Sequence, residues 1–148
     1  MEPDLIANFE SQRTDLFARW KDLLALDRTA SPLASPEILV YMIDQTIEEL
    51  LLALRRGRAA GQRRPEPVAC ECGRNPYLPY FGAGRQAIRE ALVLAQAAIP
   101  FLGAATRDAA LAELDCAYRE IERRHIEPFC AICQFSARPV RAQHATAP

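Results

Sequence analysis

The sequence predicts an all-α protein: an antiparallel bundle of four main helices with a cysteine-rich metal-binding loop at one end. Four long segments carry apolar residues at helical spacing, and no segment alternates convincingly as a strand. Two close cysteine pairs stand where such a bundle would bring them together. The chain has 148 residues, enough for one domain with its own core. We expect that domain over residues 1–135 and a frayed tail over 136–148.

The first helix is expected over residues 3–26. Its apolar stripe includes Leu5, Phe9, Leu16, Trp20, Leu23 and Leu24. Trp20 at this spacing is predicted to belong to the core rather than to line a ligand pocket.

The second helix is expected over residues 36–56. Ser35 suits the N-cap, Pro36 the first helical position, and Gly57 the end. Its polar residues fall in one narrow strip, which predicts contact with two or more neighbours and a central place in the domain.

The segment from Arg55 to Val68 is expected to be a linker. It holds two glycines, two prolines and the arginines Arg55, Arg56, Arg58, Arg63 and Arg64. Such a cluster can bind phosphate, RNA or an acidic partner. Because no aromatic residues are interleaved, a solvated loop is the preferred interpretation.

The third and fourth helices are expected over residues 80–99 and 106–127. Pro100 and Gly103 separate them, and Thr106 suits the cap of the fourth. Pro128 is expected to end the fourth helix, because the residue before a proline is biased away from helical geometry.

The helical hairpin predicts a metal site. A short turn makes the two helices antiparallel, so the start of the third and the end of the fourth lie at the same end. Cys70 and Cys72 stand just before that start, and Cys130 and Cys133 just after that end. We therefore expect a metal loop formed by residues 65–79 and 128–135, with these four cysteines as ligands.

Four thiolates suit zinc or an iron-sulfur cluster, and structural zinc is preferred. The alternatives are a redox-active thiol or disulfide pair and independent cysteines. His125 is an alternative fourth ligand, although a lone histidine on an apolar stripe is more often a core residue. Cys116 is expected at a helix contact or partly exposed.

Composition narrows the function classes. Acidic and basic residues nearly balance, 19 against 18, which argues against a nucleic-acid partner. No window approaches a membrane span, and the odd number of cysteines without a signal-like start points to a reducing cytoplasm. No nucleophile set or phosphate-binding glycine loop is present, so an enzyme is not expected.

The segments Ile6-Ala-Asn-Phe9 and Leu16-Phe-Ala-Arg-Trp20-Lys-Asp-Leu-Leu24, followed by a Ser-Pro-Glu helix start, carry a resemblance. Residues 1–56 resemble the N-terminal sensor domain of RsbR-type bacterial stress regulators. The resemblance implies a helical, globin-related module without haem that passes a signal to an output domain. The cysteine-rich half, residues 57–148, has no counterpart in that resemblance.

The sequence leaves three functions open. The first is a cytoplasmic zinc protein with a regulatory or accessory role through protein contacts, whose broad apolar faces also allow a homodimer. The second is a thiol-based redox or metal sensor that uses the same four cysteines. The third is a metalloenzyme with an open three-ligand site near His125 or Glu71.

Overall fold

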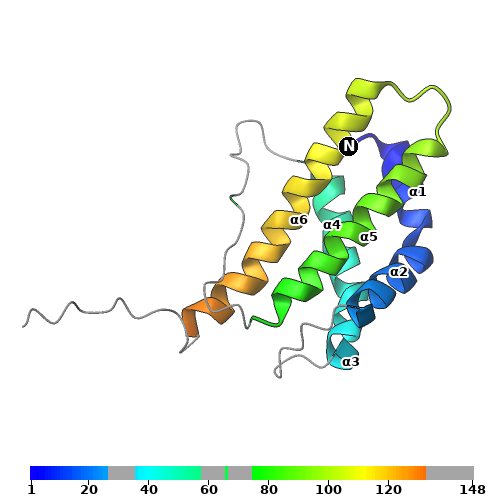
Figure 1. The fold of residues 1–148 in the computed structure, drawn as a ribbon. Helices are drawn as coiled ribbons and strands as arrows, with labels where there is room; N and C mark the ends of the chain where they lie inside the picture. The colour runs from blue at the N-terminus through cyan, green and yellow to red at the C-terminus, as the bar shows by residue number, and fades with distance from the viewer. Residues whose placement is uncertain (27–35, 58–65, 67–74, 133–148) are drawn as a thin grey trace, which may run out of the picture.

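The computed structural model of the protein describes residues 1–26, 36–57, 66 and 75–132 (Figure 1). All regular elements in these residues are helical, which confirms the predicted all-α class. The elements are α1 (Pro3–Ser11), α2 (Arg13–Leu26), α3 (Pro36–Leu39), the 3-10 helix η1 (Val40–Met42), α4 (Ile43–Arg56), α5 (Tyr77–Ala97) and α6 (Ala104–Ile132). Among these helices, none combines the length and the apolar character that crossing a membrane would require.

Two helices, α4 and α5, organise the packing. Each of them packs against α1, α2 and α6. The several neighbours of α4 are those that its narrow polar strip predicts. Helices α5 and α6 follow one another, lie side by side and run in opposite directions, with their connection at the top of Figure 1. The start of α5 and the end of α6 therefore lie at the same end.

An aromatic cluster occupies the centre of the core. Trp20 of α2, Tyr80 and Phe81 of α5 and Tyr118 of α6 are fully buried. Ring centroids are 5.0 Å apart for Trp20 and Tyr80 and 5.6 Å apart for Phe81 and Tyr118. Offset and edge-to-face pairs of this kind stabilise the packing beyond the area that they bury. The predicted core position of Trp20 is confirmed.

The polar atoms of this cluster have partners. Trp20 Nε1 donates to the carbonyl of Tyr80 over 3.1 Å, and the Tyr118 hydroxyl donates to the carbonyl of Phe81 over 3.2 Å. The Tyr80 hydroxyl lies 2.7 Å from Thr46 Oγ1. Burial raises the pKa of the Tyr80 hydroxyl well above its usual value, so this group stays neutral. The hydrogen bonds fix the rotation of α2, α4 and α6 around α5.

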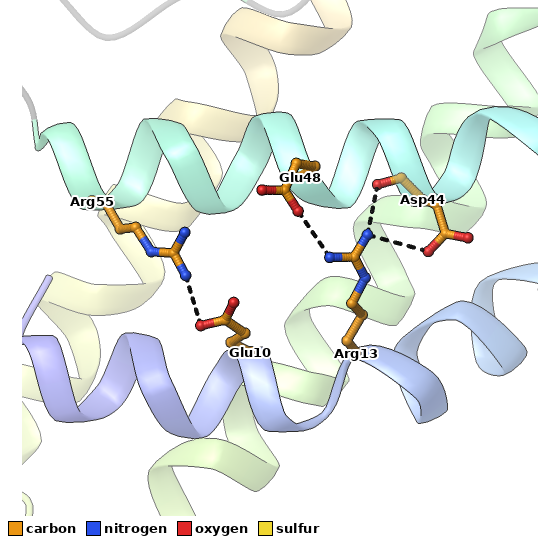
Figure 2. A network of polar contacts seen from close by, with 5 residues as sticks. All are labelled: Glu10, Arg13, Asp44, Glu48 and Arg55. Atoms are coloured by element: carbon orange, nitrogen blue, oxygen red, sulfur yellow. Dashed lines mark hydrogen bonds and ion pairs between the residues drawn. The ribbon is translucent and has the colours of Figure 1, made fainter.

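Ion pairs join α1 and α2 to α4 along the surface, as Figure 2 shows. The guanidinium of Arg13 donates to Glu48 over 2.8 Å and also reaches Asp44. Farther along the same interface, Arg55 donates to Glu10 over 2.7 Å. These groups are exposed to a large degree, so each pair contributes about 1 kcal/mol or less. Their main effect is to fix the register of the helices.

The expected helix over residues 3–26 is interrupted. Gln12 lies between α1 and α2 with φ −82° and ψ 3°, outside helical geometry. Its N–H donates to the carbonyl of Phe9, three residues back, and the Ser11 hydroxyl donates to the carbonyl of Asn8 over 2.7 Å. Short-range bonds of this kind compete with the helical ladder. The break turns Arg13 toward α4.

The helices expected over residues 36–56 and 80–99 also differ from the observed ones. The segment 36–56 begins at Pro36 as expected but contains the 3-10 turn η1 before α4. The expected helix over 80–99 is α5, which begins at Tyr77 and ends at Ala97. Pro79 lies in the first turn of α5, where backbone N–H groups have no partner within the helix, so the missing N–H of proline costs no hydrogen bond.

Helix α6 begins earlier than expected. Thr106 was expected to cap it, but the helix starts at Ala104, and the carbonyl of Gly103 accepts from the N–H of Arg107 over 3.1 Å. The Arg107 side chain also donates to the carbonyl of Leu102 over 3.0 Å. Because the helix begins two residues before Thr106, this residue lies inside the first turn and not at the N-cap position.

Candidate metal centre

Asn75 links the start of α5 to the end of α6. Its side-chain nitrogen donates to the carbonyl of Ile126 over 3.4 Å and to the sulfur of Cys130 over 3.5 Å. Its side-chain oxygen accepts from the N–H of Tyr77 over 2.9 Å. This oxygen satisfies one of the N–H groups that every helix start leaves without an intrahelical partner. Asn75 is only 1% exposed, so all three bonds lie inside the protein.

Cys130 lies on α6 rather than in a loop after it. The expectation that the fourth helix ends at residue 127 is wrong, because α6 continues through Pro128 to Ile132. Proline inside a helix removes one hydrogen bond, here to the carbonyl of Arg124, at a cost of about 3 kcal/mol. Phe129 and Cys130 offset this cost, since Phe129 packs edge-on against Tyr77 and Cys130 packs against the core. The helix thereby holds the thiol of Cys130 against the start of α5.

His125 belongs to an aromatic cluster one turn before Cys130. Its ring lies 5.7 Å from the ring of Tyr77 and 5.6 Å from that of Phe81, measured between centroids. The imidazole is half-buried. These contacts agree with a packing role for His125 and for Tyr77, and Phe81 is fully buried behind them.

Three of the four expected ligands, Cys70, Cys72 and Cys133, lie outside the described residues. Within residues 1–26, 36–57, 66 and 75–132, no group of three or more His, Cys, Asp or Glu side chains is placed to hold a metal ion. The metal site therefore stays a prediction, of which one ligand, Cys130, has a described position. Cys116 is buried on α6, as expected of a residue at a helix contact.

The arginine-rich linker is described only at its start. Arg55 pairs with Glu10 on α1, Arg56 is exposed, and Gly57 ends α4 with a φ of 67°. The remaining arginines of this cluster lie outside the described residues. One of its five guanidinium groups is therefore already used to hold α1 against α4.

Sequence reasoning missed two charged contacts that join α5 to α6 farther along the hairpin. Arg85 forms an ion pair with Glu122, and its guanidinium lies 5.7 Å above the ring of Tyr118. Arg89 binds both carboxylate oxygens of Asp115. These pairs had no signal in the sequence, because they depend on the register of two helices. Both pairs join α5 to α6 along the hairpin.

No family model matches the chain, and comparison with curated proteins and with solved structures also finds no match. The resemblance of residues 1–56 to RsbR-type sensor domains therefore stays an expectation.

The region can orient a sulfur ligand. A side-chain N–H directed at Cys130 Sγ is the kind of outer contact that positions ligands and tunes metal sites. In the same region the ring of Tyr77 packs against those of Phe81 and Phe129.

Proposed function

We propose that the protein is a cytoplasmic metal-binding helical protein in which Cys70, Cys72, Cys130 and Cys133 hold one structural zinc ion. The zinc would clamp the segment before α5 to the end of α6. The protein would then act through protein contacts, in a regulatory or accessory role. A site closed by four thiolates leaves no open position for water or substrate, so this proposal includes no catalysis.

The observation that carries the proposal is the pair of hydrogen bonds from Asn75 to Cys130 and Ile126. Cys72 is three residues before Asn75, and Cys133 is three residues after Cys130. Three residues of chain reach at most about 10 Å. The contact between Asn75 and Cys130 supports the proposal, because Cys72 and Cys133 are each attached within this reach of it, and Cys70 is two residues farther from Asn75 than Cys72.

The proposed architecture is an antiparallel bundle of four rods: α1 with α2, α3 with α4, α5, and α6. Its support lies in the contacts: α4 and α5 each pack against α1, α2 and α6. In such a bundle the metal loop stands at the end where α5 begins. The zinc would fasten the hairpin at its open end, while residues 98–103 already close the other end.

The direct test is zinc content, measured by elemental analysis of protein purified without a histidine tag. We expect one zinc per chain and a colourless protein. Cys72→Ser and Cys130→Ser should each lower the zinc content and the melting temperature. Cys116→Ala is the matched control, because Cys116 is buried on α6 away from the proposed ligands, and it should retain the metal.

A protein that holds no zinc when purified without chelator and under reducing conditions would contradict the proposal. Iron with visible absorption would replace it by an iron-sulfur cluster. Equal zinc content in Cys72→Ser, Cys130→Ser and Cys116→Ala would remove the basis of the ligand assignment.

A further inference from the structure

The end of the molecule opposite the candidate metal centre exposes apolar side chains. Phe101, in the loop between α5 and α6, is fully exposed, and Val93 and Leu94 on α5 are 53% and 57% exposed. No charged residue occurs from Ala91 to Thr106, although a quarter of the chain is charged. Large apolar side chains exposed at one end of a molecule are a feature of interaction sites.

The loop backbone holds the phenyl group of Phe101 in solvent. Phe101 has a φ of 62°, the left-handed conformation that a bulky residue rarely adopts. The next residue is fixed by the hydrogen bond from Arg107 Nε to the carbonyl of Leu102, at 3.0 Å. The exposure of Phe101 is therefore a property of a fixed loop, and not of a free chain end.

A cleft of about 470 Å³ lies one turn farther along α6. Leu5 of α1 and Ala105, Ala109 and Ala110 of α6 form much of its lining, and Glu2 and Glu113 also contribute. A cavity of about 150 Å³ can hold a benzene molecule, so the cleft has room for a phenyl ring. Phe101 does not fill the cleft of its own chain, since its side chain is fully exposed.

We propose that two copies of the chain form a dimer in which Phe101 of each copy inserts into this cleft of the other. Phe101 precedes Ala105 by four residues, so the inserting side chain and the cleft lie at the same end of each molecule. A two-fold axis at that end would bring both pairs together at once, as symmetric dimers require. The proposal is independent of the metal site.

The charges near the contact agree with a second copy as the partner. The inserting segment from Ala91 to Thr106 carries no charged residue, so it brings no unpaired charge of its own into the contact. Glu113 pairs with the amino group of Met1, and the carboxylate of Glu2 would face the positive edge of an aromatic ring. A lipid surface fits less well, because segments that bind membranes carry lysine and arginine beside their apolar residues.

Sedimentation velocity of the full chain over a range of concentrations tests the proposal. The wild type should be a dimer. Phe101→Asp should raise the dimer dissociation constant at least about tenfold, the effect of losing a central interface residue. Ala109→Trp, which fills the cleft from an exposed position, should do the same. Tyr41→Asp is the control, because Tyr41 is an 86% exposed aromatic residue on η1, and it should leave the dimer intact.

Cross-linking identifies the contact itself. A photo-reactive p-benzoylphenylalanine in place of Phe101 should link two chains, with the product mapped to the peptides that contain Leu5 or Ala109. Circular dichroism should show that every variant remains helical with an unchanged melting temperature of the monomer.

Three outcomes would overturn the proposal. The first is a wild-type monomer at high protein concentration. The second is growth to large species, which would indicate an open chain of contacts instead of a closed pair. The third is a monomer that binds vesicles of phosphatidylcholine and phosphatidylserine only when Phe101 is present.

Discussion

The side-chain amide of Asn75 donates a hydrogen bond of 3.5 Å to the sulfur of Cys130, and so joins the segment just before α5 to the last turn of α6. The same side chain caps the N–H of Tyr77 through its oxygen. One residue thus performs two separable tasks, with the oxygen supporting the helix start and the nitrogen supporting the thiol. Substitutions can separate them.

Asn75→Asp keeps the capping oxygen but loses the donor to Cys130 and to the carbonyl of Ile126, whereas Asn75→Ala loses the oxygen and the donor. We expect Asn75→Ala to lower the free energy of unfolding by about 1–2 kcal/mol, the usual cost of a lost cap. We expect both variants to weaken zinc binding by about 10- to 100-fold, as the loss of an outer contact does. Chemical unfolding measures the first effect, and competition with a chelator the second.

Equal zinc affinity in Asn75→Asp and the wild type would show that the hydrogen bond to Cys130 does not support a metal ligand. Equal stability of Asn75→Ala and the wild type would show that the cap of α5 is dispensable.

Sequence patterns predicted the all-α class and most of the core. Trp20, Ile47, Leu92 and Tyr118 lie on apolar stripes that can be read from the sequence, and all are buried. Hydrophobic periodicity succeeds here because burial of one helix face is the main stabilising effect of helices in folded proteins. The hairpin of α5 and α6 follows from two such stripes and a short turn.

The ends of the helices were less predictable, because tertiary contacts decide them. Pro128 on its own predicts the end of a helix. The helix continues past it, because Phe129 packs against Tyr77 and Cys130 packs against the core. No glycine or proline near Gln12 predicts the break there. The contacts at the break are the hydrogen bond of Ser11 to the carbonyl of Asn8 and that of Arg13 to Glu48. For the candidate metal centre, the sequence predicted only that the start of α5 and the end of α6 lie at the same end of the bundle. The role of Asn75 could not be predicted, because its partners Ile126 and Cys130 are more than 50 residues away in the sequence.

At Gly84 the missing side chain leaves room on α5 for buried rings from α2 and α6. A Cβ atom there would lie 2.1 Å from the Tyr118 hydroxyl and 2.2 Å from a ring carbon of Trp20. Gly84→Ala should therefore lower the free energy of unfolding by about 3 kcal/mol, because both buried rings would have to move. Thermal or urea unfolding measures this directly.

Gly82→Ala is the matched control, two residues away on the same helix. A Cβ at Gly82 meets nothing within 4 Å, so alanine should stabilise the helix by about 0.5–1 kcal/mol. Opposite signs for the two substitutions are expected. Destabilisation by both would indicate that α5 tolerates no added side chain in this turn, and would refute the specific role of Gly84.

Thr46 and Tyr80 form a buried pair in which each member has a defined role. Thr46 Oγ1 donates to the carbonyl of Met42 over 2.9 Å, so its single proton is used and the Tyr80 hydroxyl is the donor between the two. Thr46→Val leaves that buried hydroxyl without its acceptor, which should cost about 1–3 kcal/mol. Tyr80→Phe removes the hydroxyl itself and should cost about 1 kcal/mol.

The double variant tests this assignment. Once Tyr80 is phenylalanine, Thr46→Val no longer leaves an unsatisfied hydroxyl on residue 80, so the combined loss should fall below the sum of the single losses. Strict additivity in unfolding measurements would mean that the two hydroxyl groups do not interact.

Asp115 makes the stability of the α5–α6 hairpin depend on pH in the acidic range. Burial by itself would raise the pKa of this carboxyl, but the hydrogen bonds and charge of Arg89 outweigh burial and leave the pKa below its usual value. A lowered pKa in the folded state means that the stabilisation is present above the unfolded value of about 3.9 and is lost as pH falls through the folded value. Stability should therefore fall between pH 5 and pH 2. Glu90 contributes to this fall, because its hydrogen bonds with Arg19 also lower the pKa of its carboxyl. Asp115→Asn should cost about 1 kcal/mol at pH 7, since Arg89 is half exposed, and should make this dependence shallower. An unchanged slope of unfolding free energy against pH in Asp115→Asn would contradict the assignment.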